Sequence, residues 1–180
     1  LPHPPMYMGA SSEESMDNCA RYGLGLLTST LTPISELAPK CQYYLQKCDE
    51  TEAPYNANPG HGTIGIGRMV YVADTDEQAK EEASESVVKH VDSFTGAASS
   101  GYLGKVSEAS QQELQGADYE KLREDTIIYG SPESVIEKIK YMEEVTGADS
   151  LILHFPPYNT REQNARVLAQ FAEDVIPKFR

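Results

Sequence analysis

Short apolar runs alternate with segments of helical periodicity along most of this chain, and this alternation is the strongest constraint on its fold. Four such pairs occupy residues 6–22, 24–49, 63–94 and 150–179. The runs are apolar on successive residues, as in strands buried on both faces, and the segments after them repeat apolar residues at helical spacing. Strict alternation of this kind produces a parallel sheet that is covered by helices. We therefore predict an α/β fold.

Two further segments lie between the third and fourth pairs. An additional helix is predicted over 131–146, after a short extended piece at 126–130. Residues 95–125 are rich in Gly and Ser at their start and have only a weak helical pattern, which predicts an irregular insert. A connection of this length within a compact domain is typically a functional lid, a partner-covering insert or disorder. We expect a single domain over 1–180 with 95–125 as a lid-like insert.

A serine-rich helix start, SSEES at residues 11–15, follows the first apolar run. Ser11 and Glu14 have the spacing of a capping box, and Ser12 and Ser15 would then lie side by side on the first turn. Free backbone N–H groups and hydroxyls at a helix start are well suited to bind an anion, a phosphate in particular. The same residues also fit an ordinary capped helix. From this stretch alone both interpretations stay open.

The composition excludes several classes of partner. The formal net charge of −13 argues against nucleic acid and anionic membranes as partners. No apolar run approaches the roughly 20 residues of a membrane span, and the N-terminus lacks the layout of a signal peptide. The three cysteines form no CxxC motif and the four histidines are scattered, so no metal site is predicted. We expect a cytoplasmic protein.

Four motifs together resemble the C-terminal half of the bacterial luciferase-like flavin monooxygenases. They are PPMYMGASSEES continuing to ARYGLGL over 4–26, MVYVADTDEQA over 69–79, YGSPESV continuing to TGAD over 129–149, and FAEDVIPKF over 171–179. Their order and spacing extend over nearly the whole chain. Members of this family are (β/α)8 barrels that bind reduced FMN, or F420 in a sister branch, at the carboxyl ends of the strands. The resemblance therefore implies the C-terminal half of a TIM-type barrel.

The resemblance also implies a cofactor site. Its members would be the phosphate-binding Ser12 and Ser15, with Ser11 beside them, and Leu27, Thr28 and Ser29 along the isoalloxazine ring. The insert at 95–125 corresponds to the region where the family carries a mobile loop over the active site. His154 ends the fourth strand, where barrel ligands bind, and is the candidate substrate residue. The alternative for His154 is an ordinary hydrogen-bonded histidine at a strand end.

The chemistry that the resemblance implies belongs mainly to the cofactor. A flavin reductase would supply reduced FMN, with F420 as the alternative cofactor, and O2 would oxygenate a small organic substrate while the protein orients and shields the flavin. No residue of the chain can be assigned as a general base. The catalytic residues therefore stay unknown.

The chain carries only four of the eight units of a barrel, which usually needs about 250 residues. We therefore expect a fragment that is inactive by itself. An open half barrel leaves two sheet edges unpaired and partly uncovers the inward-facing side chains, for which we expect Tyr7, Leu26, Val70 and Leu151. This predicts self-association or pairing with the missing N-terminal half. Two alternatives stay open: a non-catalytic flavin- or phosphate-binding protein that functions as a half-size homodimer, and a half barrel from an unrelated phosphate-binding family.

Overall fold

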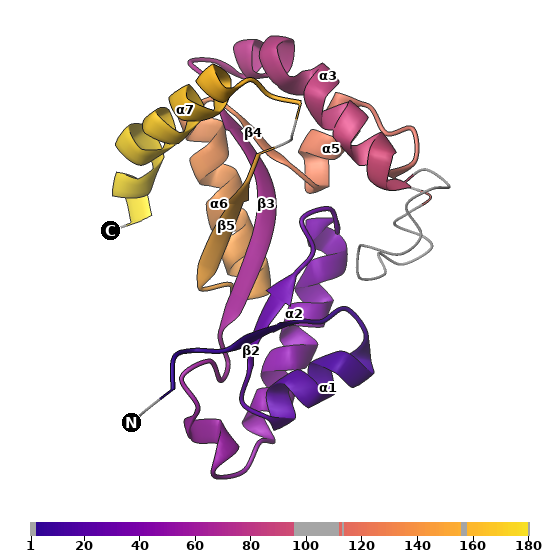
Figure 1. Cartoon of the computed structure of the whole chain (residues 1–180), viewed down its shortest axis with the longest axis vertical. Coiled ribbons are helices and arrows are strands. Elements are labelled where there is room, and N and C mark those ends of the chain that lie inside the picture. The colour runs from indigo at the N-terminus through magenta and orange to yellow at the C-terminus, as the bar shows by residue number, and fades with distance from the viewer. Residues whose placement is uncertain (1–2, 96–111, 113, 156–157, 180) are drawn as a thin grey trace.

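The computed structural model describes residues 3–95, 112, 114–155 and 158–179, and in this part of the chain it contains five parallel strands with helices packed around them (Figure 1). The strands are β1 (Tyr7–Gly9), β2 (Gly25–Thr28), β3 (Ile64–Val72), β4 (Ile128–Gly130) and β5 (Ser150–His154). The helices are α1 (Glu13–Arg21), α2 (Ile34–Asp49), α3 (Asp76–Thr95), α5 (Tyr119–Asp125), α6 (Pro132–Thr146) and α7 (Arg161–Gln170). A 3-10 turn lies at Tyr55–Ala57, and π and 3-10 turns continue α7 over Phe171–Val175 and Ile176–Phe179. The predicted parallel α/β fold is confirmed.

The long strand β3 is the centre of the sheet, and all nine of its residues are buried. It pairs with β2 and β5 through its first half and with β4 through residues 70–72. On the other side of β2, β1 pairs from Tyr7↔Gly25 to Gly9↔Leu27. Within the described residues, β1, β4 and β5 each pair with one strand only. The sheet therefore has free edges at β1 and β5, and the short strand β4 also has an unpaired side.

Two hydrophobic clusters share β3. The first lies under α1, α2 and α6 and receives Ile66, Val70 and Val72 from the strand. The second lies among α3, α5 and α7, at the upper end of the molecule in Figure 1, and receives Met69 and Tyr71. Successive side chains of a strand point to opposite faces, so one strand supplies both clusters.

The prediction for the inward-facing side chains is wrong for three of four residues. Leu26 and Val70 are fully buried in the first cluster, and Leu151 packs against it. Only Tyr7 lies on the opposite face, where its ring would be 2.4 Å from a Cβ placed on Gly25. The period of a strand is two, so an error of one residue moves every side chain to the other face.

We call the face of the sheet opposite the first cluster the open face. On this face the first half of β3 carries the glycines Gly65 and Gly67, which have no side chains. A Cβ on Gly65 would lie 2.7 Å from the Leu27 side chain and 3.7 Å from that of Ile152. Leu27 of β2 and Ile152 of β5 therefore meet across β3. The side chain of Ile152 is about half exposed, with a relative accessibility of 48%.

The insert predicted at 95–125 lies largely outside the described residues, which omit 96–111 and 113. Its last part is described and is not irregular. Helix α5 occupies Tyr119–Asp125, and Leu114, Tyr119 and Leu122 are buried in the second cluster. The apolar residues of this short helix were too few to give a periodic signal, and packing against α3 supplies the stability instead. No helix among the described residues is long and apolar enough to cross a membrane.

Candidate functional site

The serine-rich segment forms the start of α1, one residue later than predicted. Ser12 is the N-cap, and its Oγ accepts a hydrogen bond from the Ser15 N–H at 3.3 Å. The Ser15 Oγ accepts in return from the N–H groups of Ser12, at 3.1 Å, and Ser11, at 3.3 Å. The capping box is therefore made by Ser12 and Ser15, and its prediction from Ser11 and Glu14 is wrong. Two serines at this spacing can form the reciprocal pair because the Ser15 hydroxyl reaches back over one turn.

The start of α1 leaves donors at the surface. The first N–H groups of a helix have no partner within the helix, and here they belong to Glu13 and its neighbours. The Ser12 Oγ donates to the Ser15 Oγ at 3.0 Å, and the Ser15 Oγ donates to the Ser12 carbonyl at 2.8 Å. Both hydroxyls can rotate towards an incoming anion. The carboxylates of Glu13 and Glu14 oppose an anion here, so its charge needs a cation from elsewhere.

The end of β2 lies beside this helix start. The Ala10 N–H donates to the Leu27 carbonyl at 3.2 Å, which continues the pairing of β1 with β2 to the carboxyl ends of both strands. Thr28 ends β2, and its Oγ1 is buried without a hydrogen-bond partner in the described part of the chain. The Ser29 Oγ accepts from the Leu31 N–H at 3.3 Å. The six residues predicted to bind the cofactor are thus brought together at one edge of the sheet.

The start of α1 offers hydrogen-bond donors, and the glycines of β3 carry no side chains on the open face. The Thr28 hydroxyl lies at the carboxyl end of β2, on the face that its register partner Ile66 shares with the first cluster, and a buried hydroxyl without a partner gains stability from a polar group placed beside it. On the open face, the side chains of Leu27 and Ile152 lie over Gly65, and that of Thr30 lies over Gly67. Side chains of this kind can move to admit a ring.

His154 lies at the end of β5, apart from the six residues at α1 and β2. Its register partner in β3 is Met69, which places it on the same face of the sheet as Ile152. Its Nδ1 is buried and has no hydrogen-bond partner among the described residues. Its ring lies beside that of His90 from α3, with 5.5 Å between the ring centroids.

Sequence reasoning did not assign a site role to His90. Burial of its imidazole, with His154 beside it, lowers the pKa of His90 from 6.5 to about 4. The ring is therefore neutral at physiological pH. The helical spacing of His90 from Val87 and Val91 placed it near the apolar face of α3, and that spacing was the available signal.

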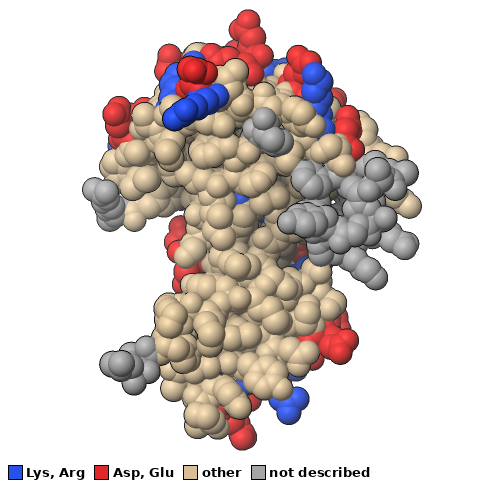
Figure 2. Space-filling model, in the orientation of Figure 1, with Lys and Arg blue, Asp and Glu red and all other residues tan. Residues whose placement is uncertain are grey.

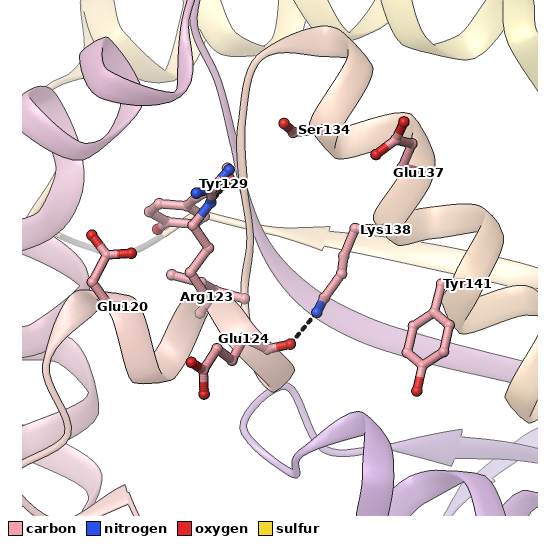
Figure 3. Close-up of a pocket in the computed structure, with 9 residues that line it drawn as sticks. Glu120, Arg123, Glu124, Tyr129, Ser134, Glu137, Lys138 and Tyr141 are labelled. Carbon is pink, nitrogen blue, oxygen red and sulfur yellow. Dashed lines mark hydrogen bonds between the residues drawn. The ribbon is translucent and has the colours of Figure 1, made fainter.

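A separate cavity of about 440 Å³ lies between α5 and α6 (Figure 3). It contains the cations Arg123 and Lys138 together with the carboxylates Glu120, Glu124 and Glu137. The Lys138 ammonium donates to the Glu124 carbonyl, and the Arg123 guanidinium donates to the Tyr129 carbonyl and forms an ion pair with Asp76. Both cations are engaged, and none of the predicted site residues lines this cavity. It is therefore distinct from the site at α1 and β2.

A parallel α/β sheet with polar residues at the carboxyl ends of its strands is the arrangement of barrel enzymes, which bind their ligands at that end. The sequence profile of the luciferase-like monooxygenases matches residues 1–150. The chain belongs to the luciferase-like monooxygenase family. No curated protein matches the chain.

Solved structures extend this result to the fold. The chain is similar to the oxygenating constituent of 3,6-diketocamphane monooxygenase from Pseudomonas putida, determined in complex with FMN, at 21% identity and a TM-score of 0.70, over 97% of this chain and 49% of that one. It is also similar to the monooxygenase RslO1 from Streptomyces bottropensis, at 16% identity and a TM-score of 0.70, over 99% and 49% of the two chains. The coenzyme F420-dependent tetrahydromethanopterin reductase from Methanopyrus kandleri matches at 17% identity and a TM-score of 0.64, over 98% and 51%. The chain spans about half the length of these proteins, and the predicted TIM-type fold class is confirmed.

Proposed function

We propose that the chain forms the C-terminal half of a flavin-dependent monooxygenase barrel and holds the phosphate end of the flavin. One observation carries the proposal: the start of α1 and the end of β2 lie together at the carboxyl ends of two parallel strands. That edge is where barrel enzymes bind their ligands. The family membership of the chain supports a flavin as the ligand.

Each predicted residue takes a role that its position supports. Ser12 and Ser15, with the Ser11 N–H beside them, bind the phosphate through hydroxyl and backbone donors. The ring side of the cofactor is bound by Leu27, Thr28 and Ser29 from the end of β2. His154 faces the substrate from the end of β5.

The cofactor is reduced FMN supplied by a flavin reductase, with F420 as the alternative. The neighbour from Pseudomonas putida was determined with FMN, and that from Methanopyrus kandleri depends on F420. Reduced flavin supplies the electrons with which O2 oxygenates a small organic substrate. The chain spans about half of a barrel, so we expect no turnover from it alone.

The phosphate site is tested by the double substitution Ser12→Ala, Ser15→Ala. We expect the Kd for FMN to rise at least about tenfold, because each hydrogen bond to a charged group contributes about 1.5–3 kcal/mol. The Kd for riboflavin, which has no phosphate, should not change. Fluorescence titration of both ligands measures these values.

The matched control for this test is Ser131→Ala, Ser134→Ala, because these serines form the equivalent N-cap of α6. The control also removes the Ser134 hydrogen bond to Asp76, so it should cost at least as much stability and still leave the affinity for FMN unchanged. An unchanged Kd for FMN in the Ser12, Ser15 variant, in a chain that does bind FMN, would contradict the phosphate site.

We further propose that the edge strands β1 and β5 pair with a partner, either a second copy of the chain or the other half of a barrel. Beside β5 lies a cavity of about 660 Å³ lined by Leu151, Leu153, Phe171 and Phe179. In the view of Figure 2 the charged side chains gather at the top, over α3 and α7, whereas the middle of the molecule is largely uncharged. Unpaired edges and apolar surface of this kind favour association.

The association is tested by light scattering on wild type and Ile152→Lys. We expect the wild type to have a mass above that of one chain, and Ile152→Lys to shift it towards one chain, because a lysine on an edge strand opposes pairing. Tyr141→Lys is the control, since Tyr141 is equally exposed but lies on α6. A wild type that has the mass of one chain at all concentrations would contradict self-association.

A homodimer that binds FMN but does not consume O2 with substrate would support the non-catalytic alternative.

A further inference from the structure

Arg68 is a charged residue in the middle of β3 that no solvent reaches, with a relative accessibility of 0%. Its guanidinium donates three hydrogen bonds to backbone carbonyls: Nη1 to Ser29 at 3.0 Å and to Gly67 at 2.9 Å, and Nη2 to Thr32 at 3.0 Å. No carboxylate among the described residues forms an ion pair with it. Burial lowers the pKa of Arg68 to about 10, against the opposing effect of Asp125, so the guanidinium remains charged at neutral pH.

Two of the three acceptors belong to the loop between β2 and α2. This loop has contacts on both faces of β3. On the open face the Thr30 methyl group lies 2.8 Å from where a Cβ of Gly67 would be, and the Leu31 side chain is buried in the second cluster. Arg68 follows Gly67 in β3, so its side chain points to the opposite face of the strand. Its guanidinium donates to the carbonyls of Ser29 and Thr32, near the two ends of the loop.

The start of α2 is fixed from a different element. The Ser35 N–H and hydroxyl donate to the Asp125 carboxylate at the end of α5. The loop is therefore held at two places: by Arg68 in the middle of the sheet, and by Asp125 at the start of α2, directly after the loop. The Arg68 Nε is buried without a hydrogen-bond partner among the described residues, so the charge depends on the carbonyls that accept from Nη1 and Nη2. A buried charge is costly without such partners, so the Arg68 side chain favours the loop conformation that supplies them.

We propose that Arg68 is a positioning residue that holds the β2–α2 loop in the conformation in which Thr28 and Ser29 receive the flavin ring. The proposal rests on the proposed function, and it adds a residue that does not touch the ligand. The hydrogen bond from Arg68 to the Ser29 carbonyl restrains the backbone of the loop directly after Thr28. Loss of the guanidinium frees the loop without removing any group that contacts the flavin.

The test compares Arg68→Met and Arg68→Lys with the wild type. Methionine fills the space but leaves the carbonyls without donors, whereas lysine keeps the charge and restores part of the hydrogen bonding. We expect Arg68→Met to raise the Kd for FMN and for riboflavin equally, by about tenfold, because the loop contacts the ring and not the phosphate. We expect Arg68→Lys to recover part of that loss. The circular dichroism of the bound isoalloxazine should change in Arg68→Met and return towards the wild-type spectrum in Arg68→Lys.

Two measurements separate positioning from a general loss of stability. Hydrogen exchange should rise at residues 28–33 in Arg68→Met and remain at the wild-type level in α6. Arg166→Met is the control, since this arginine of α7 is partly exposed and bonds Glu82 and the Tyr71 hydroxyl, away from the loop. It should leave both affinities and the exchange of 28–33 unchanged. If Arg68→Met does not fold, the same readouts on Arg68→Lys decide the question, with smaller changes in the same direction.

Three outcomes would overturn the proposal. One is wild-type exchange at 28–33 in a folded Arg68 variant, and another is wild-type affinity for both ligands. A loss of affinity for FMN alone is the third, because it would connect Arg68 with the phosphate instead of the ring. A wild type that binds neither ligand would overturn the proposed function and the flavin role of the loop with it. Exchange at 28–33 would then decide by itself whether Arg68 holds the loop.

Discussion

The free energy of unfolding is expected to fall by up to about 3 kcal/mol as the pH drops from 6.5 to 4, because His90 is buried as a neutral imidazole. Burial, with His154 beside the ring, lowers the pKa of His90 from 6.5 to about 4 in the folded protein. Between these two values the unfolded chain binds a proton at His90 and the folded chain does not. Stability is therefore complete above pH 6.5 and is lost as the pH falls towards 4.

Urea unfolding at a series of pH values measures this slope in wild type and His90→Gln. Glutamine does not titrate, so the variant should be less stable at pH 7 but should lose little stability between pH 6.5 and 4. His3→Gln is the control, since His3 lies exposed near the start of the chain and should leave the slope unchanged. An equal slope in His90→Gln and wild type would show that the protons bind elsewhere.

Replacement of Asp76 by alanine is expected to lower the free energy of unfolding by about 3 kcal/mol. Its carboxylate accepts from the Ser131 N–H at 2.7 Å and the Ser134 hydroxyl at 3.0 Å, and it forms an ion pair with Arg123. It thereby joins the starts of α3 and α6 to α5. Gly130 leaves it room, because a Cβ there would lie 2.5 Å from the Asp76 Oδ1. Thermal or urea unfolding at neutral pH measures the loss.

The pH dependence of Asp76 lies in a different range from that of His90. Burial opposes ionisation of Asp76, but the hydrogen bonds from Ser131 and Ser134 and the charge of Arg123 outweigh it and lower the pKa below 3.8. The stabilisation by Asp76 is therefore complete above about pH 4 and is lost only as the pH falls through the lowered pKa.

Asp118→Ala is the control for Asp76→Ala, since Asp118 accepts one N-cap hydrogen bond in α5 and its replacement should cost about 1 kcal/mol. Equal losses for the two variants would contradict the role of Asp76 as a junction.

The order of the elements could be predicted from the sequence, because strand and helix signals are local. The face of the sheet to which each strand side chain points could not be predicted. The apolar residues of β2 and β3 are consecutive, so alternation gives no indication of which of Leu26 and Leu27 faces the helices. The register with β1, seen in the pairing of Met8 with Leu26, decides it, and register is a property of the assembled sheet.

The candidate site likewise has a part that follows from local sequence patterns and a part that does not. The three serines belong to one helix start, and their grouping follows from local spacing, with an error of one residue at the cap. Arg68 and Asp76 act on segments far from them in sequence, at Ser29 and Ser131, and no local pattern connects such pairs. The sequence therefore indicated the residues that we propose to bind the ligand, whereas the residues that hold distant segments together became visible only in the structure.

The central position of β3 has a consequence for how the chain folds. The strand gives alternate side chains to both hydrophobic clusters, so neither cluster can form before β3 is in place. Its first residue is bound by the Asp149 carboxylate, 85 positions later in the chain, through the Ile64 N–H at 2.8 Å. Contacts of such long range close slowly, because a large loop must be ordered before they form. We expect the two clusters to be lost in one cooperative transition, with folding limited by the arrival of β5 at β3.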